Sequence, residues 1–280
     1  MIVYRTKTDL DGHLLSLQSE GKTIGLVPTM GALHQGHASL VERATADNDV
    51  VVVSIFVNPT QFNDPSDLDN YPRTLDQDLE LLRQLKADIV FIPSVKEMYP
   101  ETDKQIFDLG NLDKVMEGKY REGHFNGVAQ IVSKLFLLIR PHRAYFGQKD
   151  FQQLVIIRKL VEILDADIKI VSCPIIRDKD GLAMSSRNTR LSKEERKLAP
   201  FIFETLIKAR EQMDFKTPAQ LKKWVTLHFK TQPAFRLEYF EIVEDKGLTP
   251  IEEWENEVNK VACVAVHLGD VRLIDNLNFD

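Results

Sequence analysis

Two histidines three residues apart stand at a predicted junction between a strand and a helix. His34 and His37 follow the short apolar run 23–27 and precede residues 38–48, where apolar side chains recur with helical spacing. The start of a helix favours a phosphate, because its backbone N–H groups are unsatisfied and its dipole is positive. Imidazoles there can donate hydrogen bonds to phosphate oxygens and stabilise charge during attack at phosphorus. The loop 26–40 is therefore the candidate active-site loop, although histidines that only cap the helix would fit the same pattern.

A lysine occupies a similar junction later in the chain. The brief strand 144–146 runs into Gly147-Gln148-Lys149-Asp150, and helical spacing follows. Lys149 there can neutralise an α-phosphate during in-line transfer, and Gln153 can face the same crevice. A surface lysine paired with the neighbouring aspartate is the alternative.

Amide and acidic side chains follow other predicted elements. Asn58 and Gln61 come after the apolar strand 50–57, at the end where ligands bind in open α/β sheets, although turn chemistry accounts for them equally well. Asp78 lies in the first turn of a helix from Thr74, where aspartate most often stabilises the helix start and Mg²⁺ binding is the alternative. The pattern of residues 93–127 is irregular, which predicts a functional loop. His124 in this stretch either contacts a ligand or has a structural role.

Composition places these residues in an ordinary globular protein. The 280-residue chain is 43% hydrophobic and has a formal net charge of −6, which gives no general attraction to nucleic acid or to an anionic membrane. Cys173 and Cys263 belong to no metal or disulfide pattern, so we expect free thiols and a cytoplasmic protein. The sequence contains no apolar run of membrane-spanning length and no recognisable signal peptide.

Strands alternate with helices through the first part of the chain. Strands are predicted near residues 24, 51, 89, 144 and 168, which indicates a parallel sheet covered on both faces. After residue 192 the composition shifts to Lys/Glu-rich helices, with a helix from Thr217 and strands at 236–244 and 261–268. We therefore predict an α/β protein. Residues 1–174 would form a Rossmann-like, doubly wound domain and residues 175–280 a smaller α+β lid domain.

Two motifs carry a first resemblance. His34-Gln35-Gly36-His37 is similar to the H-x-G-H ("HIGH") loop of the nucleotidylyl-transferring superfamily. Met184-Ser185-Ser186-Arg187 resembles the K-M-S-K-S loop that accompanies it, and its hydroxyls and guanidinium could clamp the β- and γ-phosphates of a nucleotide.

The combination of motifs closely resembles the pantothenate synthetase family over nearly the whole chain. The segments that carry this resemblance are 28–37, 56–62, 71–74, 123–125, 146–153 and 184–188. The resemblance implies ATP-dependent condensation of (R)-pantoate with β-alanine to pantothenate, a coenzyme A precursor. The reaction would pass through pantoyl adenylate and release pyrophosphate and AMP. It also implies a homodimer.

The resemblance also implies roles for individual residues. His37, His34 and Lys149 would be catalytic, and Gln61, Gln153 and Asn58 would bind the acid substrate, with Gln61 also serving β-alanine. ATP would contact Met30, Gly31, Ala32, Leu33, His34, Gln35, Gly36, His37, Gly147, Gln148, Lys149, Asp150, Ile176, Met184, Ser185, Ser186 and Arg187. Asp78 is the candidate protein ligand of the Mg²⁺ that accompanies ATP.

The sequence departs from the family at two positions and leaves other functions open. Gln148 stands where many members carry Glu, which excludes a carboxylate role for that residue, and Thr60 stands where Met is common. A nucleotidylyltransferase with a stable product and a nucleotide-binding regulatory module are the rival functions. An aminoacyl-tRNA synthetase fragment fits less well, because the sequence has no basic face for tRNA.

Overall fold

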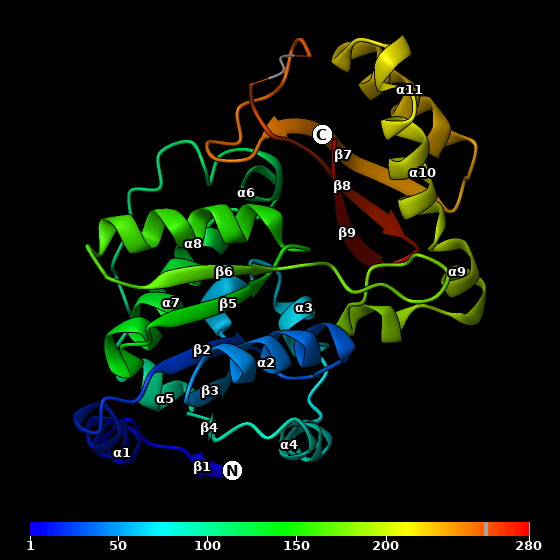
Figure 1. Cartoon of the computed structure of the whole chain (residues 1–280). Helices are drawn as coiled ribbons and strands as arrows, with labels where there is room; N and C mark the ends of the chain where they lie inside the picture. Colours follow the sequence, from blue (N-terminus) through cyan, green and yellow to red (C-terminus); the bar gives the residue numbers. More distant parts are fainter. Residues whose placement is uncertain (255–256, 280) are drawn as a thin grey trace. The chain divides into compact units, whose positions relative to one another are not determined.

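The protein, as a computed structural model that describes residues 1–254 and 257–279, folds as two compact units (Figure 1). The first unit comprises Met1–Gln148 and Ile156–Pro174, and the second comprises Lys149–Val155 and Ile175–Asp280. The long segment of the second unit begins at Ile175, and a short segment that starts at Lys149 belongs to the same unit.

Six parallel strands form the sheet of the first unit, in the order β1-β4-β3-β2-β5-β6. They are β1 (Ile2–Tyr4), β2 (Ile24–Thr29), β3 (Val50–Ile55), β4 (Ile89–Phe91), β5 (Arg143–Gly147) and β6 (Lys169–Cys173). The predicted α/β class is confirmed, but the sequence analysis missed β1. That strand has only three residues, and Ile2 and Val3 are 48% and 37% exposed, so it lacks the apolar pattern of a buried strand.

Helices cover both faces of this sheet. The long helices are α1 (Lys7–Ser19), α2 (Gln35–Asp47), α4 (Leu75–Gln84), α7 (His124–Ile139) and α8 (Phe151–Ile163), and α8 begins in the segment assigned to the second unit. On one face, α2 and α4 pack through Val41 and Leu82 against strand residues such as Val53. Val52 and Leu26 alternate toward the other face and are also fully buried, as expected of a strand covered on both sides.

Short elements occupy the connections. They are η1 (Pro59–Gln61), α3 (Pro65–Asp69), α5 (Val95–Met98) and α6 (Met116–Tyr120). The stretch predicted to be irregular, 93–127, ends earlier than expected, because α7 begins at His124, directly after Gly123 in a left-handed conformation with φ 77°.

The second unit packs helices against a small antiparallel sheet. Its strands are β7 (Phe235–Glu244), β8 (Lys260–Leu268) and β9 (Val271–Asn278), in that order. Its helical segments are η2 (Ser186–Arg190), α9 (Lys193–Leu198), α10 (Phe201–Arg210), η3 (Met213–Phe215) and α11 (Pro218–Lys230). The predicted strands 236–244 and 261–268 are confirmed, but β9 was missed because Asp275 and Asn276 interrupt its apolar alternation.

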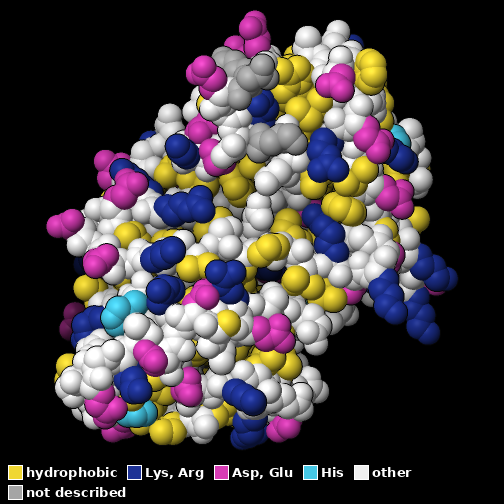
Figure 2. Space-filling model, viewed as in Figure 1, with side chains coloured by type: hydrophobic (Ala, Val, Ile, Leu, Met, Phe, Trp, Pro, Cys, Tyr) yellow, Lys and Arg dark blue, Asp and Glu magenta, His cyan; other side chains and the backbone are white. Residues whose placement is uncertain are grey.

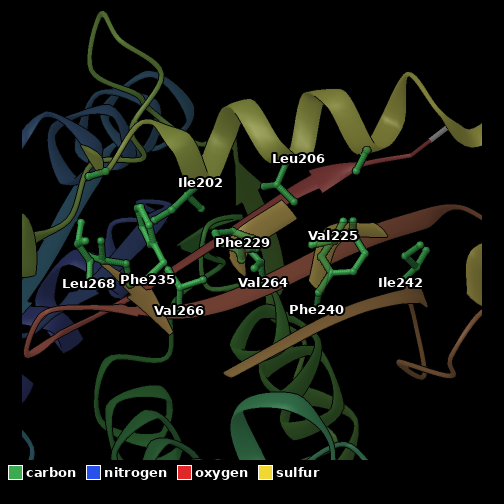
Figure 3. Close-up of a cluster of buried hydrophobic side chains, with 14 of the residues drawn as sticks. Ile202, Leu206, Val225, Phe229, Phe235, Phe240, Ile242, Val264, Val266 and Leu268 are labelled. Atoms are coloured by element: carbon green, nitrogen blue, oxygen red, sulfur yellow. The ribbon is translucent and has the colours of Figure 1, made fainter. Parts of the chain in front are cut away.

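The core of this unit lies between the helices and one face of the sheet (Figure 3). Leu206 of α10 and Phe229 of α11 meet Val264 and Val266 of β8, and all four are nearly or fully buried. Burying large apolar side chains in this way is the main stabilising term of such a unit.

The surface is mixed in charge. On the face seen in Figure 2, Lys and Arg side chains are interspersed with Asp and Glu, in keeping with the net charge of −6. Within 1–254 and 257–279, every helix is too short or too polar to cross a membrane.

A glycine pair tests how closely α7 packs on η1. A Cβ added at Gly127 of α7 would lie 2.1 Å from the carbonyl oxygen of Thr60, whereas one added at Gly12 of α1 would meet nothing within 4 Å. Gly127→Ala should therefore lower the free energy of unfolding by about 1–3 kcal/mol or more. Gly12→Ala should raise it by about 0.5–1 kcal/mol, because alanine loses less entropy in a helix. Thermal and denaturant unfolding check both changes, and a neutral Gly127→Ala would contradict the described contact.

Candidate active site

Neighbouring parallel strands bring the predicted site segments of the first unit to one edge of the sheet. In the register of β2 and β3, Thr29 pairs with Ile55, so the two strands end together. The loop 30–34 and the turn at Asn58–Gln61 therefore leave from the same edge. β5 is parallel to β2 and ends at Gly147, which brings Gln148 to that edge as well. The carboxyl edge is where ligands bind in open α/β sheets.

The loop after β2 turns through two left-handed residues. Gly31 has φ 79° and Ala32 has φ 50°, and the latter is a strained value for a residue with a Cβ. Thr29 supports the turn, because its Oγ1 accepts a hydrogen bond from the Gly31 N–H at 3.2 Å and donates to the Ser54 carbonyl oxygen at 2.8 Å.

A buried carboxylate holds the rest of this loop. Asp78 of α4 is 2% exposed, and its two oxygens accept hydrogen bonds from the backbone N–H groups of Ala32 (3.0 Å) and Leu33 (2.8 Å). The Thr74 hydroxyl donates to the same carboxylate at 3.1 Å. These three hydrogen bonds give Asp78 a structural role, and the expectation that it also binds Mg²⁺ stays a prediction. Charge-assisted hydrogen bonds to backbone N–H groups are strong, so Asp78 stabilises the conformation of the loop.

His34 and His37 cap α2 reciprocally through their Nδ1 atoms. His34 Nδ1 accepts from the Gly36 N–H at 3.1 Å, and His37 Nδ1 accepts from the His34 N–H at 3.4 Å. An Nδ1 that accepts a hydrogen bond carries no proton, so the neutral ring has its proton on Nε2. The helix-capping interpretation is therefore confirmed for the Nδ1 atoms, whereas the phosphate interpretation stays a prediction for the Nε2–H groups of the same rings. Nδ1 caps the helix, and Nε2–H is the donor that suits a phosphate.

The ring centroids of the two histidines lie 4.2 Å apart. The paired Nε2–H groups stand at the positive end of the α2 dipole, which adds to their attraction for a polyanion.

The turn after β3 is fixed from within. Gln61 is 8% exposed, its backbone N–H donates to the Asn58 carbonyl oxygen at 3.2 Å, and its own carbonyl accepts from His124 Nδ1 at 2.7 Å. Asn58 is fully buried and hydrogen-bonded to other protein groups. The expectation that Asn58 contacts substrate does not fit this burial. His124 has the structural role that the sequence left open.

In the second unit, the last strand holds the backbone of Lys149. Asn276 of β9 donates from Nδ2 to the Lys149 carbonyl oxygen at 2.9 Å. The adjacent Asp275 makes a two-pronged ion pair with Arg177, at 2.6 and 2.9 Å. Burial raises the pKa of Asp275, and the Arg177 guanidinium opposes that change. Sequence reasoning missed Arg177, Asp275 and Asn276. For Asp275 and Asn276 of β9, the signal was their polarity within an apolar strand pattern.

The Met184–Arg187 loop belongs to the same unit. The Met184 N–H donates to the Ile176 carbonyl oxygen at 3.0 Å, so these two predicted nucleotide contacts are neighbours. Ser185 caps η2 by accepting from the Arg187 N–H at 3.3 Å.

The turn before this loop is held by Arg196 of α9. Arg196 pairs with Asp178 at 2.9 Å and with Asp180 at 2.6 Å, and its guanidinium keeps the pKa of Asp180 below its ordinary value. In this turn Gly181 is left-handed, with φ 94°.

The predicted site residues thus fall into two sets. The first unit holds Met30, Gly31, Ala32, Leu33, His34, Gln35, Gly36, His37, Asn58, Gln61, Gly147 and Gln148. The second holds Lys149, Asp150, Gln153, Ile176, Met184, Ser185, Ser186 and Arg187.

Comparison with known proteins gives one consistent result. Residues 2–278 match the family model described as pantoate-beta-alanine ligase. The chain is 51% identical over 280 residues to the pantothenate synthetase of Porphyromonas gingivalis strain W83, with all of both chains covered. It is 56% identical to that of Phocaeicola vulgatus, over 100% of this chain and 99% of the relative.

Solved structures agree with these relatives. The pantothenate synthetase of Thermus thermophilus aligns with a TM-score of 0.92 and 41% identity, over 100% of this chain and 99% of that one. The pantoate-beta-alanine ligase of Francisella tularensis, solved in complex with beta-gamma ATP and beta-alanine, aligns with a TM-score of 0.84 and 37% identity, over 100% and 98% of the two chains.

Two aspartates in the first turn of α4 test the role of the buried carboxylate. Asp78→Ala leaves the N–H groups of Ala32 and Leu33 without their acceptor, so the free energy of unfolding should fall by about 1–3 kcal/mol. Asp76 lies in the same turn and is exposed, so Asp76→Ala should change it by less than about 1 kcal/mol. Denaturant unfolding measures both. Equal effects of the two substitutions would show that only the helix dipole matters.

Proposed function

Because this chain belongs to the pantoate–β-alanine ligase family, we propose that it condenses (R)-pantoate with β-alanine at the expense of ATP. The products are pantothenate, AMP and pyrophosphate, and pantothenate is a precursor of coenzyme A. The observation that carries the proposal is the pair of capped imidazoles, His34 and His37, whose Nε2–H groups suit a polyphosphate at the carboxyl edge of the sheet.

The first step is adenylation of the acid. A pantoate carboxylate oxygen attacks the α-phosphorus of ATP, the bond from that phosphorus to the bridging oxygen breaks, and pyrophosphate leaves. His34 and His37 donate to the phosphates, with His37 as the proton donor, and the Lys149 ammonium neutralises charge at the α-phosphate. The nucleotide is held by further residues of the two sets, which are Met30 to Gly36, Gly147 to Asp150, Ile176, and Met184 to Arg187.

The second step forms the amide. The β-alanine amine attacks the carbonyl carbon of pantoyl adenylate, the bond to the AMP oxygen breaks, and the amine loses a proton. We propose that Gln61 and Gln153 hold pantoate and that Gln61 also serves β-alanine. Asn58 supports Gln61 from within the protein. The reaction needs no nucleophilic side chain, so positioning and charge neutralisation supply the catalysis.

We further propose that the nucleotide substrate is the Mg²⁺ complex of ATP. Among residues 1–254 and 257–279, no cluster of three or more His, Cys, Asp or Glu side chains could hold a metal ion. Asp78 is engaged by the loop, and so we assign no step to a protein-bound metal.

A homodimer and a cytoplasmic location complete the proposal. The dimer is an expectation from the family, and light scattering coupled to gel filtration tests it. The cytoplasm suits the two cysteines, Cys173 and Cys263, which are buried free thiols.

The proposed reaction has a direct test. Incubation with ATP, Mg²⁺ and pantoate should release pyrophosphate, and AMP and pantothenate should appear only after β-alanine is added. Mass spectrometry follows all three products. A stable adenylylated product would indicate a nucleotidylyltransferase, and intact, ATP-binding protein without turnover would indicate a regulatory module.

Replacing His34 by asparagine separates its two roles. Asparagine is among the best helix N-caps, so His34→Asn should preserve the unfolding free energy to within about 0.5 kcal/mol. It removes the Nε2–H donor, and the rate of pyrophosphate formation should fall by about 10²–10³-fold. His13→Asn, on α1, is the control and should keep full activity. An active His34→Asn would show that this histidine only caps the helix.

A further inference from the structure

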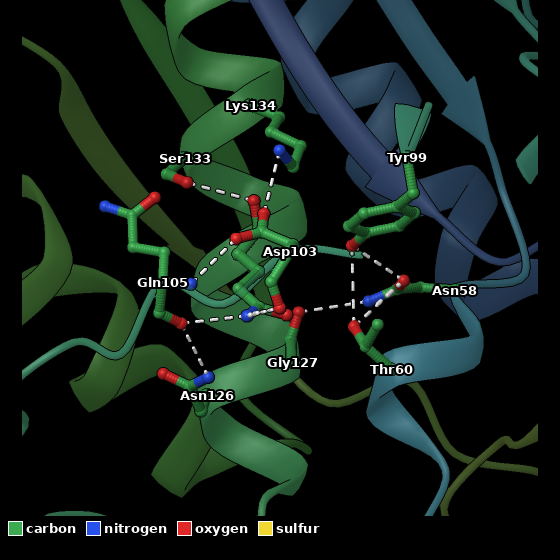
Figure 4. Close-up of polar contacts among 10 residues, drawn as sticks. Asn58, Thr60, Tyr99, Asp103, Gln105, Asn126, Gly127, Ser133 and Lys134 are labelled. Atoms are coloured by element: carbon green, nitrogen blue, oxygen red, sulfur yellow. Dashed lines mark hydrogen bonds and ion pairs between the residues drawn. The ribbon is translucent and has the colours of Figure 1, made fainter. Parts of the chain in front are cut away.

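Asn58 is buried at the centre of a small hydrogen-bond network beside the proposed acid-binding residue, and the network extends through the half-buried Tyr99 to the exposed Thr60 (Figure 4). Its Nδ2 donates to the Gly127 carbonyl oxygen of α7 at 3.0 Å. Only the N–H side of the amide can serve a carbonyl, so Oδ1 must face the other way. There it accepts from the Tyr99 hydroxyl at 2.9 Å and from the Thr60 hydroxyl at 3.2 Å.

This network sets the turn that carries Gln61. The Asn58 carbonyl accepts from the Gln61 N–H, and the Asn58 side chain links the start of the turn to α7. The turn and the helix touch closely, because a Cβ at Gly127 would collide with the Thr60 carbonyl oxygen. The direction of the Gln61 side chain therefore depends on how Asn58 is held.

Tyr99 is the group that reaches this network from outside the turn and α7. It follows α5 and lies against Phe56, with ring centroids 6.3 Å apart. Burial raises the pKa of Tyr99 above its ordinary value, so its hydroxyl keeps the proton at neutral pH and acts as a donor.

The segment after Tyr99 is fastened along α7. Lys134 pairs with Asp103 at 2.8 Å and also lies over the Tyr99 ring, 5.3 Å from its centroid. Further along, Gln130 and Asn126 donate to the Gln105 carbonyl oxygen at 2.8 and 3.0 Å (Figure 4). The tyrosine hydroxyl is thus delivered to Asn58 by a segment that is fixed at several points.

We propose that Tyr99 is a positioning residue for the acid substrate, because its hydroxyl orients the Asn58 amide and thereby the turn that presents Gln61. The inference rests on the proposed function, in which Gln61 holds pantoate. Tyr99 acts through Asn58, and the role requires the hydroxyl and not only the ring.

The test is Tyr99→Phe in the full-length chain, which removes the hydroxyl and keeps the ring. Loss of this part-buried hydrogen bond should raise KM for pantoate by about three- to tenfold, with KM for ATP unchanged within about twofold. Tyr99→Phe/Thr60→Val removes both hydroxyl donors to Asn58 and should raise KM for pantoate further. Hydrogen–deuterium exchange of the peptide spanning 56–63 should be faster in the variants than in the wild type.

Tyr145→Phe is the matched control. The Tyr145 hydroxyl is also bonded to an asparagine amide, that of Asn48, at 2.7 Å, but it lies in the contact between β5 and α2. A change of general stability would affect both variants, whereas a rise in KM for pantoate alone should appear only in Tyr99→Phe.

The outcomes distinguish the two claims. Wild-type protein without pantoate-dependent turnover would overturn the proposed function and this inference with it. Active wild-type protein, together with Tyr99→Phe that has unchanged KM for pantoate and unchanged exchange at 56–63, would overturn the inference alone. Equal changes in KM for ATP and pantoate would also contradict it, because they indicate a general structural role.

Discussion

The buried carboxylate of Asp78 fixes the shape on which the candidate site depends. Its oxygens accept hydrogen bonds from the backbone N–H groups of Ala32 and Leu33. These bonds hold the loop in a path that includes left-handed residues, a backbone conformation that is otherwise unfavourable in free energy. With the loop in this path, His34 reaches the N-cap of α2 and His37 reaches back to it. Each imidazole ring then accepts a hydrogen bond at Nδ1 and, when neutral, carries its proton on Nε2. Loop strain, helix capping and imidazole tautomer are thus one connected arrangement, in which Asp78 and Thr29 hold the loop.

The residues proposed for the chemistry are divided between the two units. The imidazoles and Gln61 belong to the first, where parallel strands end together, whereas Lys149 and the Met184–Arg187 loop belong to the second. Within the second unit, the Asn276 side chain holds the Lys149 backbone against β9 through a hydrogen bond. The ion pair between Arg177 and Asp275 holds the segment before the Met184–Arg187 loop against the same strand. The cationic groups that the proposed adenylation requires are therefore held by one framework, and the imidazoles by another.

The sequence predicted best what is encoded locally. The run 50–57 predicts a buried strand because nearly all its side chains are apolar, and the His34–His37 motif lies within four residues.

The features that the sequence could not predict depend on contacts between residues that are distant in the chain. Asp78 meets partners 45 and 46 residues away, so its carboxylate looked like a helix start or a metal ligand. Asn58 likewise has the residue type of a substrate ligand, and its hydrogen-bond partners, Gly127 and Tyr99, lie far from it in the sequence. Strand β9 was not predicted, because Asp275 and Asn276 are residue types typical of loops, although both are hydrogen-bonded within the fold. In each case local patterning was outweighed by tertiary hydrogen bonding.

The central claim is that a carboxylate oxygen of the acid attacks the α-phosphorus of ATP. The most direct measurement uses pantoate labelled with ¹⁸O in both carboxylate oxygens, with mass spectrometry of the products after β-alanine is added. Attack of the carboxylate on the α-phosphorus should place one ¹⁸O in AMP and leave the other in the amide carbonyl of pantothenate. Label in inorganic phosphate with formation of ADP, or AMP that contains no ¹⁸O, would contradict it.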